Sequence, residues 1–238
     1  MIASNAKHVL KIAKLLRRCK MNIDSSFHFR RGVSCYHVAD FESAVNEFSK
    51  VLKFDPDSVD AYLYRALATD ECGDPDDLRT DLETILRLDP ESGQGHFARA
   101  WMLFNENIRK AEQDPKTLYE ETIQLYSNAI LLSPDLAPAY FYRGEMRCGV
   151  GDGQGALEDY DKAIELERSY AQAYWRRGQV RAERGDFRQA IDDLEFYLTL
   201  PMGATWNSQV MKNISAYWLQ LALQSEAKDK SQLPPREI

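Results

Sequence analysis

Apolar residues along this chain keep a helical spacing within short segments, and the segments return at a fixed distance. In each segment an aromatic residue or His is followed four positions later by Gly or Ala. The pairs are His28 and Gly32, Tyr62 and Ala66, His96 and Ala100, Tyr140 and Gly144, and Tyr174 and Gly178. A second series stays in step with the first: Ala44, Leu78, Thr122, Ala156 and Ala190. Four-residue spacing is typical of α-helices, so the pattern predicts repeated units of two helices each.

The turns between the predicted helices carry their own signals. The two helices of a unit are joined by Gly-Asp pairs at residues 73–74, 151–152 and 185–186. Gly readily adopts the left-handed conformation that ends a helix, and Asp can cap the start of the next one. LDP at 88–90 and SPD at 133–135 end second helices. These signals predict a tight turn inside each unit and a Pro-containing turn after it.

With a period of about 34 residues, this pattern resembles the tetratricopeptide repeat family over residues 25–200. The repeats are 25–58, 59–92, 93–136 with an insertion, 137–170 and 171–200. Departures from the family pattern are Arg168 in place of Pro, Cys35 in place of Tyr, and Leu78 and Thr122 in place of Ala. The resemblance implies an all-α, right-handed α-solenoid, in which each unit buries its apolar face against its neighbours.

An Arg precedes the small residue of every repeat, and in four repeats an acid follows sixteen residues later. The pairs are Arg31 and Glu47, Arg65 and Asp81, Arg143 and Asp159, and Arg177 and Asp193. We expect an ion pair between the two helices of each unit. Repeat three has Leu125 instead of the acid and carries about ten extra residues within 105–115. This insertion is expected to lengthen its first helix before Asp114 and Pro115 open the next.

Both ends of the chain are expected to be helical. Residues 1–24 form a basic amphipathic helix, for which three interpretations stay open: a cap packed on the first repeat, an organelle-targeting segment within 1–20, or a contact with an anionic membrane surface. Residues 201–226 are predicted to form a C-terminal capping helix with a polar outer face, because Val210, Ile214, Tyr217 and Leu221 recur at helical spacing. Residues 227–238 are predicted to be disordered.

Composition narrows the function classes. The net charge is −7, yet residues 1–39 contain eight Lys or Arg and one acid, so the remainder is strongly acidic. This acidic body argues against nucleic-acid binding. Four cysteines without a CxxC pair favour a reducing, cytoplasmic location over a disulfide or zinc framework. The four histidines lack metal-ligand spacing and no nucleophile motif occurs, so we expect neither catalytic residues, nor a metal, nor a cofactor.

The family resemblance implies that the first helices of the repeats line a concave face that binds a protein or peptide partner. Its predicted apolar contacts are Phe29, Leu63, Phe97, Trp101, Phe104, Phe141 and Trp175, with Glu145 and Gln179 as polar contacts. Further polar residues at its edge are Arg30, His37, Glu71, Gln172, Arg176 and Glu183. The positions that grip chaperone C-termini in some family members hold Phe29, Val33, Leu63 and Leu67 here, which disfavours that role. We therefore expect a scaffold or adaptor, with membrane recruitment or self-association as the alternative.

Overall fold

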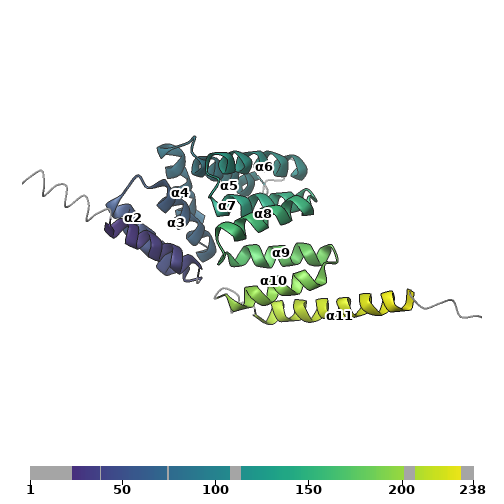
Figure 1. Ribbon diagram of the computed structural model, residues 1–238. Helices are drawn as coiled ribbons and strands as arrows, with labels where there is room; N and C mark the ends of the chain where they lie inside the picture. The colour runs from purple at the N-terminus through teal and green to yellow at the C-terminus, as the bar shows by residue number, and fades with distance from the viewer. Residues whose placement is uncertain (1–22, 38, 74, 108–113, 201–206, 232–238) are drawn as a thin grey trace, which may run out of the picture. The chain divides into compact units, whose positions relative to one another are not determined.

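The computed structural model describes residues 23–37, 39–73, 75–107, 114–200 and 207–231, and all regular secondary structure in them is helical (Figure 1). The chain divides into two compact units, Met1–Met102 and Leu103–Ile238. The first unit contains a helix at 23–37, followed by α2 (Phe41–Phe54), α3 (Val59–Cys72), α4 (Pro75–Leu88) and most of α5 (Gly93–Asn107). The second contains the end of α5 and α6 (Pro115–Leu132), α7 (Ala137–Gly149), α8 (Gly153–Leu166), α9 (Ala171–Glu183), α10 (Phe187–Thr199) and α11 (Asn207–Ser231). The fold is the predicted all-α solenoid of helix pairs.

The turn signals act largely as predicted. Gly73, Gly151 and Gly185 have φ angles of 78°, 81° and 84°, which are left-handed values. Asp152 caps α8 by accepting a hydrogen bond from the Gly155 amide, and Asp114 caps α6 with Pro115 in its first turn. Asp186 precedes α10 but makes no side-chain cap. Asp74 lies outside the described residues.

The small residues of the first helices lie where the two helices of a unit meet. A methyl group added at Gly32 would stand 2.8 Å from the Phe48 ring, and one at Gly144 would stand 2.7 Å from Tyr160 Cε1. Real carbon atoms do not approach so closely without displacement. Phe48 and Tyr160 both lie sixteen residues after their Gly and are fully buried. The Gly therefore allows a large aromatic ring to fill the space between the helices.

Gly144→Ala is expected to destabilise the protein by about 1–3 kcal/mol, because the added methyl group overpacks a closed contact with Tyr160. Helix propensity alone would predict a gain of about 1 kcal/mol. The matched control is Gly153→Ala in α8, where the added carbon meets only Val180 Cγ1 at 3.6 Å. Urea unfolding of the two variants checks the sign: a Gly144 variant as stable as the Gly153 variant would contradict the packing argument.

All four predicted Arg–acid pairs are present. Arg65–Asp81 and Arg143–Asp159 are each joined at 2.6 Å, and Arg177–Asp193 at 2.5 Å. The fourth pair, Arg31–Glu47, is longer at 3.7 Å, because Lys50 and His28 also hold the carboxylate of Glu47. The acids are nearly fully buried. Burial raises the pKa of the Asp81 and Asp159 carboxyls, although their Arg partners act to lower it.

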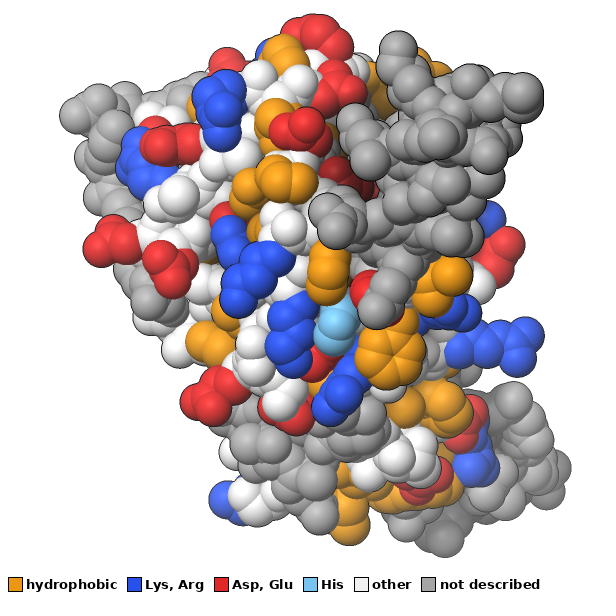
Figure 2. Space-filling view, turned by 90° about the vertical axis from the view of Figure 1, so that its left-hand side faces the viewer, with side chains coloured by type: hydrophobic (Ala, Val, Ile, Leu, Met, Phe, Trp, Pro, Cys, Tyr) orange, Lys and Arg blue, Asp and Glu red, His pale blue; other side chains and the backbone are white. Residues whose placement is uncertain are grey.

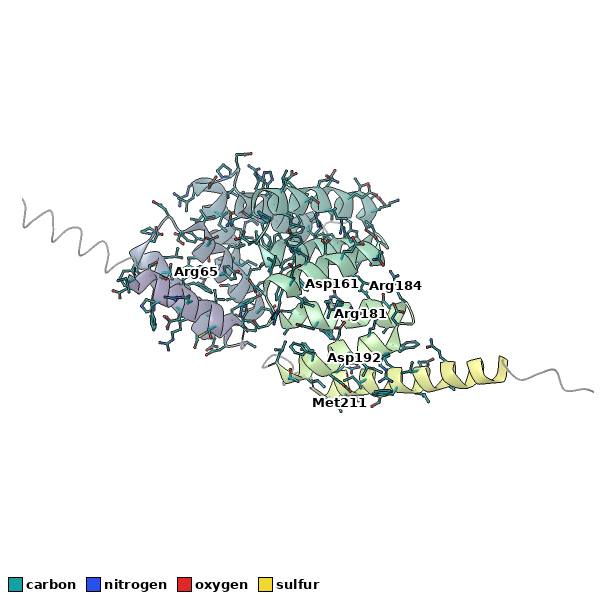
Figure 3. All side chains as sticks on the ribbon, in the orientation of Figure 1. Arg65, Asp161, Arg181, Arg184, Asp192 and Met211 are labelled. Atoms are coloured by element: carbon teal, nitrogen blue, oxygen red, sulfur yellow. The ribbon has the colours of Figure 1, made fainter. Side chains whose placement is uncertain are left out.

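Three of these arginines have a second partner in the structure. We call the Arg, together with the acid of its own repeat and this second partner, an Arg bridge. The partner lies sixteen residues before the Arg, on the second helix of the preceding repeat. Nη1 of the Arg donates to Ser49 from Arg65, to Ser127 from Arg143 and to Asp161 from Arg177. Figure 3 labels Arg65 on α3, and Asp161 on α8 next to Arg181 on α9. Each Arg bridge thus connects the second helix of one repeat to the second helix of the repeat before it.

The ends of the chain and the insertion are described in part. Residues 1–22 and 108–113 lie outside the described residues, so the predicted N-terminal helix and the lengthening of α5 beyond Asn107 stay predictions. The predicted C-terminal helix is present as α11 and ends at Ser231 rather than at 226. Five residues assigned to a disordered tail are therefore helical. Its outer face is mixed rather than polar throughout: Met211, Trp218, Leu219 and Leu223 are exposed on α11 beside polar residues such as Lys212 and Gln220.

Candidate partner-binding face

In the first unit, the predicted contact residues divide between core and surface. Leu63 and Phe97 have no exposed area, which corrects the prediction that they face a ligand. Each lies three residues before the small residue of its helix, and residues three apart share a helix face; Phe29 and Trp175 have the same spacing but remain half-buried. That face packs against the second helix. Trp101 is half-buried and hydrogen-bonds Asp70.

Phe29 remains partly accessible in the first unit. Its ring packs edge-on against Phe48 and Tyr64. It also lines an open pocket of about 320 Å³ between the helix at 23–37 and α2, whose other walls include Phe54 and Asp55. Phe29 is therefore less enclosed than Leu63 and Phe97, which occupy the same place in the next two repeats.

In the second unit, Phe141 is 9% exposed and contacts the rings of Tyr160 and Tyr170. Like Leu63, it belongs to the core of its unit. Phe104 is half-buried against Tyr119. Of the predicted aromatic contacts, Phe97 and Phe141 are thus internal, whereas Phe29, Trp101, Phe104 and Trp175 keep some accessible surface.

Trp175, Glu145 and Gln179 are the predicted site residues of α7 and α9 that keep accessible surface. Trp175 is half-buried and packs on the cluster formed by α9, α10 and α11. Glu145 lies on α7 and Gln179 on α9. One further side chain, Arg176, joins the three into a single arrangement.

Arg176 links the first helices of repeats four and five. Its Nε donates to both carboxylate oxygens of Glu145 at 2.8 Å, and its Nη2 contacts the same carboxylate. Its Nη1 donates to Gln179 Oε1 at 3.1 Å, and its guanidinium lies 5.6 Å from the centre of the Trp175 ring. The Tyr160 hydroxyl, on α8, donates to Glu145 Oε1 at 2.6 Å. We call Glu145, Trp175, Arg176 and Gln179 the α7–α9 face.

Burial and charge at this face stabilise the charged form of Arg176 and the protonated forms of Tyr160 and Cys148. Burial acts to lower the pKa of Arg176, but the hydrogen bonds and negative charge of Glu145 outweigh it, so the pKa is raised. Burial, followed by the charge of Glu145, raises the pKa of the Tyr160 hydroxyl, which stays protonated. Burial also raises the pKa of Cys148, whose sulfur lies 3.4 Å from that hydroxyl. A protonated thiol is a poor nucleophile.

On the face of the molecule drawn in Figure 2, hydrophobic side chains appear in small groups between charged ones. Within the described ranges, no three His, Cys, Asp or Glu side chains are grouped to hold a metal ion. None of the described helices has the length and apolar character needed to cross a membrane.

The sequence identified Glu145 and Arg176 as separate polar positions but not as a pair. Their separation of 31 residues crosses a repeat boundary, so the sixteen-residue spacing found within repeats does not reveal it. A different signal is available: residues one period apart occupy equivalent places on adjacent first helices. Glu145 and Arg176 are 31 residues apart, three fewer than one period, so the long side chain of Arg176 can reach Glu145 on the adjacent first helix.

A family model described as tetratricopeptide repeat matches residues 149–201. Among solved structures, the tetratricopeptide repeat protein TTC0263 of Thermus thermophilus is similar with a TM-score of 0.57 and 18% identity, over 82% of this chain and 99% of that one. Yeast Tom70 gives a TM-score of 0.54 and 20% identity over 90% of this chain and 45% of the Tom70 chain. A tetratricopeptide repeat protein from Parabacteroides merdae gives a TM-score of 0.52 and 17% identity over 80% of this chain and 71% of that one.

A search of curated proteins found no match to this chain. Identities at this level establish the fold rather than a shared partner. The 34-residue register, the paired helices with small residues at their contacts, and the match at 149–201 agree with one another. On this evidence residues 149–201 match the tetratricopeptide repeat family, and the chain has the fold of tetratricopeptide repeat proteins.

Proposed function

We propose that this protein is a non-enzymatic scaffold that binds an extended peptide segment of a partner protein on the α7–α9 face. The observation that carries the proposal is the Arg176–Glu145 ion pair between the first helices of consecutive repeats. It holds a partly exposed guanidinium in one place beside an aromatic ring. Repeat solenoids use their extended faces for binding, and this arrangement gives such a face a fixed polar centre.

The chemistry of the face suits a peptide backbone. Gln179 Oε1 accepts from Arg176, so the amide nitrogen of Gln179 is directed away from the guanidinium and can donate to a peptide carbonyl. Trp175 supplies apolar area for a neighbouring side chain of the peptide. Trp and Arg are common among the residues that dominate binding energy at interfaces. The helices are formed before binding, so the ordering cost falls mainly on the peptide.

Gln179→Arg is expected to weaken capture of the partner about tenfold or more. The new cation would lie beside Arg176, repel its guanidinium and cover the ring of Trp175. The matched control is Gln189→Arg, the same exchange at an exposed position of the second helix α10. Tagged wild type and both variants would be used to purify partners from native lysate, and the captured proteins compared quantitatively.

Equal capture by wild type and the Gln179 variant would place binding elsewhere on the molecule and refute the proposal. Loss of capture by both variants would trace the effect to added charge rather than to the α7–α9 face. The Gln189 variant should have the melting temperature of the wild type, since Gln189 is exposed, and circular dichroism shows whether the Gln179 variant, which loses a hydrogen bond from Arg176, is folded.

The remaining functional expectations stay predictions. Contacts of Phe29 and Trp101 with a partner would form on the first unit, separately from the α7–α9 face. Membrane recruitment or organelle targeting would depend on residues 1–22, which lie outside the described residues. The absence of nucleic-acid binding and the cytoplasmic location depend on composition alone.

A further inference from the structure

In repeats four and five, a second Arg lies four residues after the Arg of the Arg–acid pair. Arg147 Nη1 donates to Asp159 Oδ2 at 3.0 Å. Arg181 Nη1, on the helix labelled in Figure 3, donates to Asp193 Oδ2 at 2.6 Å. The same two oxygens also accept from the Nε of the first Arg, at 3.0 Å in both repeats. Two guanidinium groups therefore share one nearly buried carboxylate.

Repeat two has Thr69 instead of this second Arg, and a cavity lies beside it. Thr69 is four residues after Arg65 and twelve before Asp81, which are the spacings of the second Arg in repeats four and five. The cavity measures about 180 Å³, and one water molecule takes up about 30 Å³. We call it the repeat-two cavity. Its polar lining residues, from α2, α3 and α4, are Ser49, Arg65, Thr69, Asp77, Thr80 and Asp81.

The carboxylate of Asp81 has room for a further donor. Its Oδ2 accepts from Arg65 Nε at 2.8 Å, and its Oδ1 accepts from Arg65 Nη2 at 2.6 Å. Within the described residues Arg65 is its one donor, whereas the acids of repeats four and five each accept from two arginines. A carboxylate oxygen can accept two hydrogen bonds. Since Asp81 is 2% exposed, bulk water reaches this oxygen poorly.

The repeat-two cavity also has an excess of negative charge. Its described lining has two carboxylates, Asp77 and Asp81, against the guanidinium of Arg65. In repeat five, two arginines lie against two carboxylates, so the charges balance. One added cation would give repeat two the same balance. Opposite charges attract strongly where water is partly excluded.

We propose that the repeat-two cavity binds the guanidinium group of an arginine side chain supplied by a partner protein. This group would take the place that the second Arg takes in repeats four and five, donating to Asp81 Oδ2 and to the Asp77 carboxylate. Arg suits the cavity better than Lys, because its planar group presents five donors in fixed directions. Thr69 and Thr80 supply hydroxyl acceptors.

The burial of the lining fits a side chain that enters from the surface. Asp81 and Thr69 are 2% and 4% exposed, whereas Asp77 and Thr80 are exposed to solvent. The charged end of an arginine can therefore reach the buried carboxylate while its backbone stays outside. The repeat-two cavity lies in the first unit, so this proposal does not depend on the α7–α9 face.

The test is an NMR titration of the isotope-labelled full chain with the blocked peptide acetyl-Gly-Arg-Gly-amide. The amide signals of Thr69, Asp77 and Thr80 should shift and reach saturation. A control peptide carries citrulline in place of Arg, which has nearly the same shape but no charge. It should leave these signals in place, because a neutral group cannot balance the two carboxylates.

Two variants of the chain make the test specific. Thr69→Arg supplies the guanidinium from the chain itself, so it should abolish the response to the peptide and raise the melting temperature. Asp77→Asn should weaken binding of the peptide about tenfold. The matched control is Asp76→Asn, an exposed acid of the same helix outside the described lining, which should bind as wild type does.

Three results would overturn the proposal. The first is the absence of a saturable shift in wild type, or equal shifts with both peptides. The second is equal binding by wild type and Asp77→Asn. The third is a wild type that does not respond beside an Arg17→Gln, Arg18→Gln variant that does, because the chain's own arginines would then fill the cavity instead of a partner's.

Discussion

Asp159→Ala is expected to lower the free energy of unfolding by about 3 kcal/mol, which corresponds to a fall in melting temperature of roughly 6–12 °C. Asp159 is 2% exposed and accepts hydrogen bonds from two arginines, Arg143 at 2.6 and 3.0 Å and Arg147 at 3.0 Å. Removing the carboxylate leaves the partly buried guanidinium of Arg143 without its counter-charge and leaves Arg147 with only the more distant Asp152, at 3.8 Å. The cost is at the low end for a broken buried pair because both arginines keep some contact with water.

The control for Asp159 is Glu158→Ala, one residue earlier on α8 and exposed to solvent. It should change stability by less than about 0.5 kcal/mol. Chemical and thermal unfolding of both variants, followed by circular dichroism, makes the comparison. If the two variants were equally stable, the Arg–acid pairs would be a by-product of the repeat rather than a contribution to its stability.

Phe97→Ala is expected to cost about 3–5 kcal/mol, because the ring has no exposed area and its removal leaves a cavity in the core. Phe27→Ala, at a position 55% exposed in the same unit, should cost far less. Calorimetry or urea unfolding measures both. A folded, equally stable Phe97 variant that loses partner binding would restore the assignment of Phe97 to a ligand-contacting surface.

The ion pairs could be predicted because they depend on local connectivity. Two helices joined by a short turn of constant length bring residues sixteen apart together in every repeat but the third, and the charges at Arg65 and Asp81 are visible in the sequence. The second partners of Arg65 and Arg143 could not be predicted because Ser49 and Ser127 are uncharged and belong to the preceding repeat. Nothing in their own repeat marks them as partners.

The candidate site was harder to predict than the fold. An aromatic residue three positions before the small residue of a first helix can point to a groove or to the core, and the resemblance to the family does not decide between the two. Leu63 and Phe97 are fully buried, whereas Phe29 and Trp175, which have the same spacing to the small residue of their helices, keep accessible surface. The exposed apolar residues of α11 were missed for a different reason. Their line, Met211 to Leu223, runs beside the line that packs inward, and both have the same spacing.

The Arg bridge has a consequence for where this chain can change in length. Both partners of Arg143 lie sixteen residues away, one on each side, so an added or deleted residue in either turn would shift a charge away from its acceptor. Repeat three, where Leu125 replaces the acid, has no such pair to lose, and it is there that the natural sequence carries its extra residues. Peptide tags or reporter domains should therefore be accepted between Asn107 and Asp114, while the Gly-Asp turns of repeats four and five should reject them.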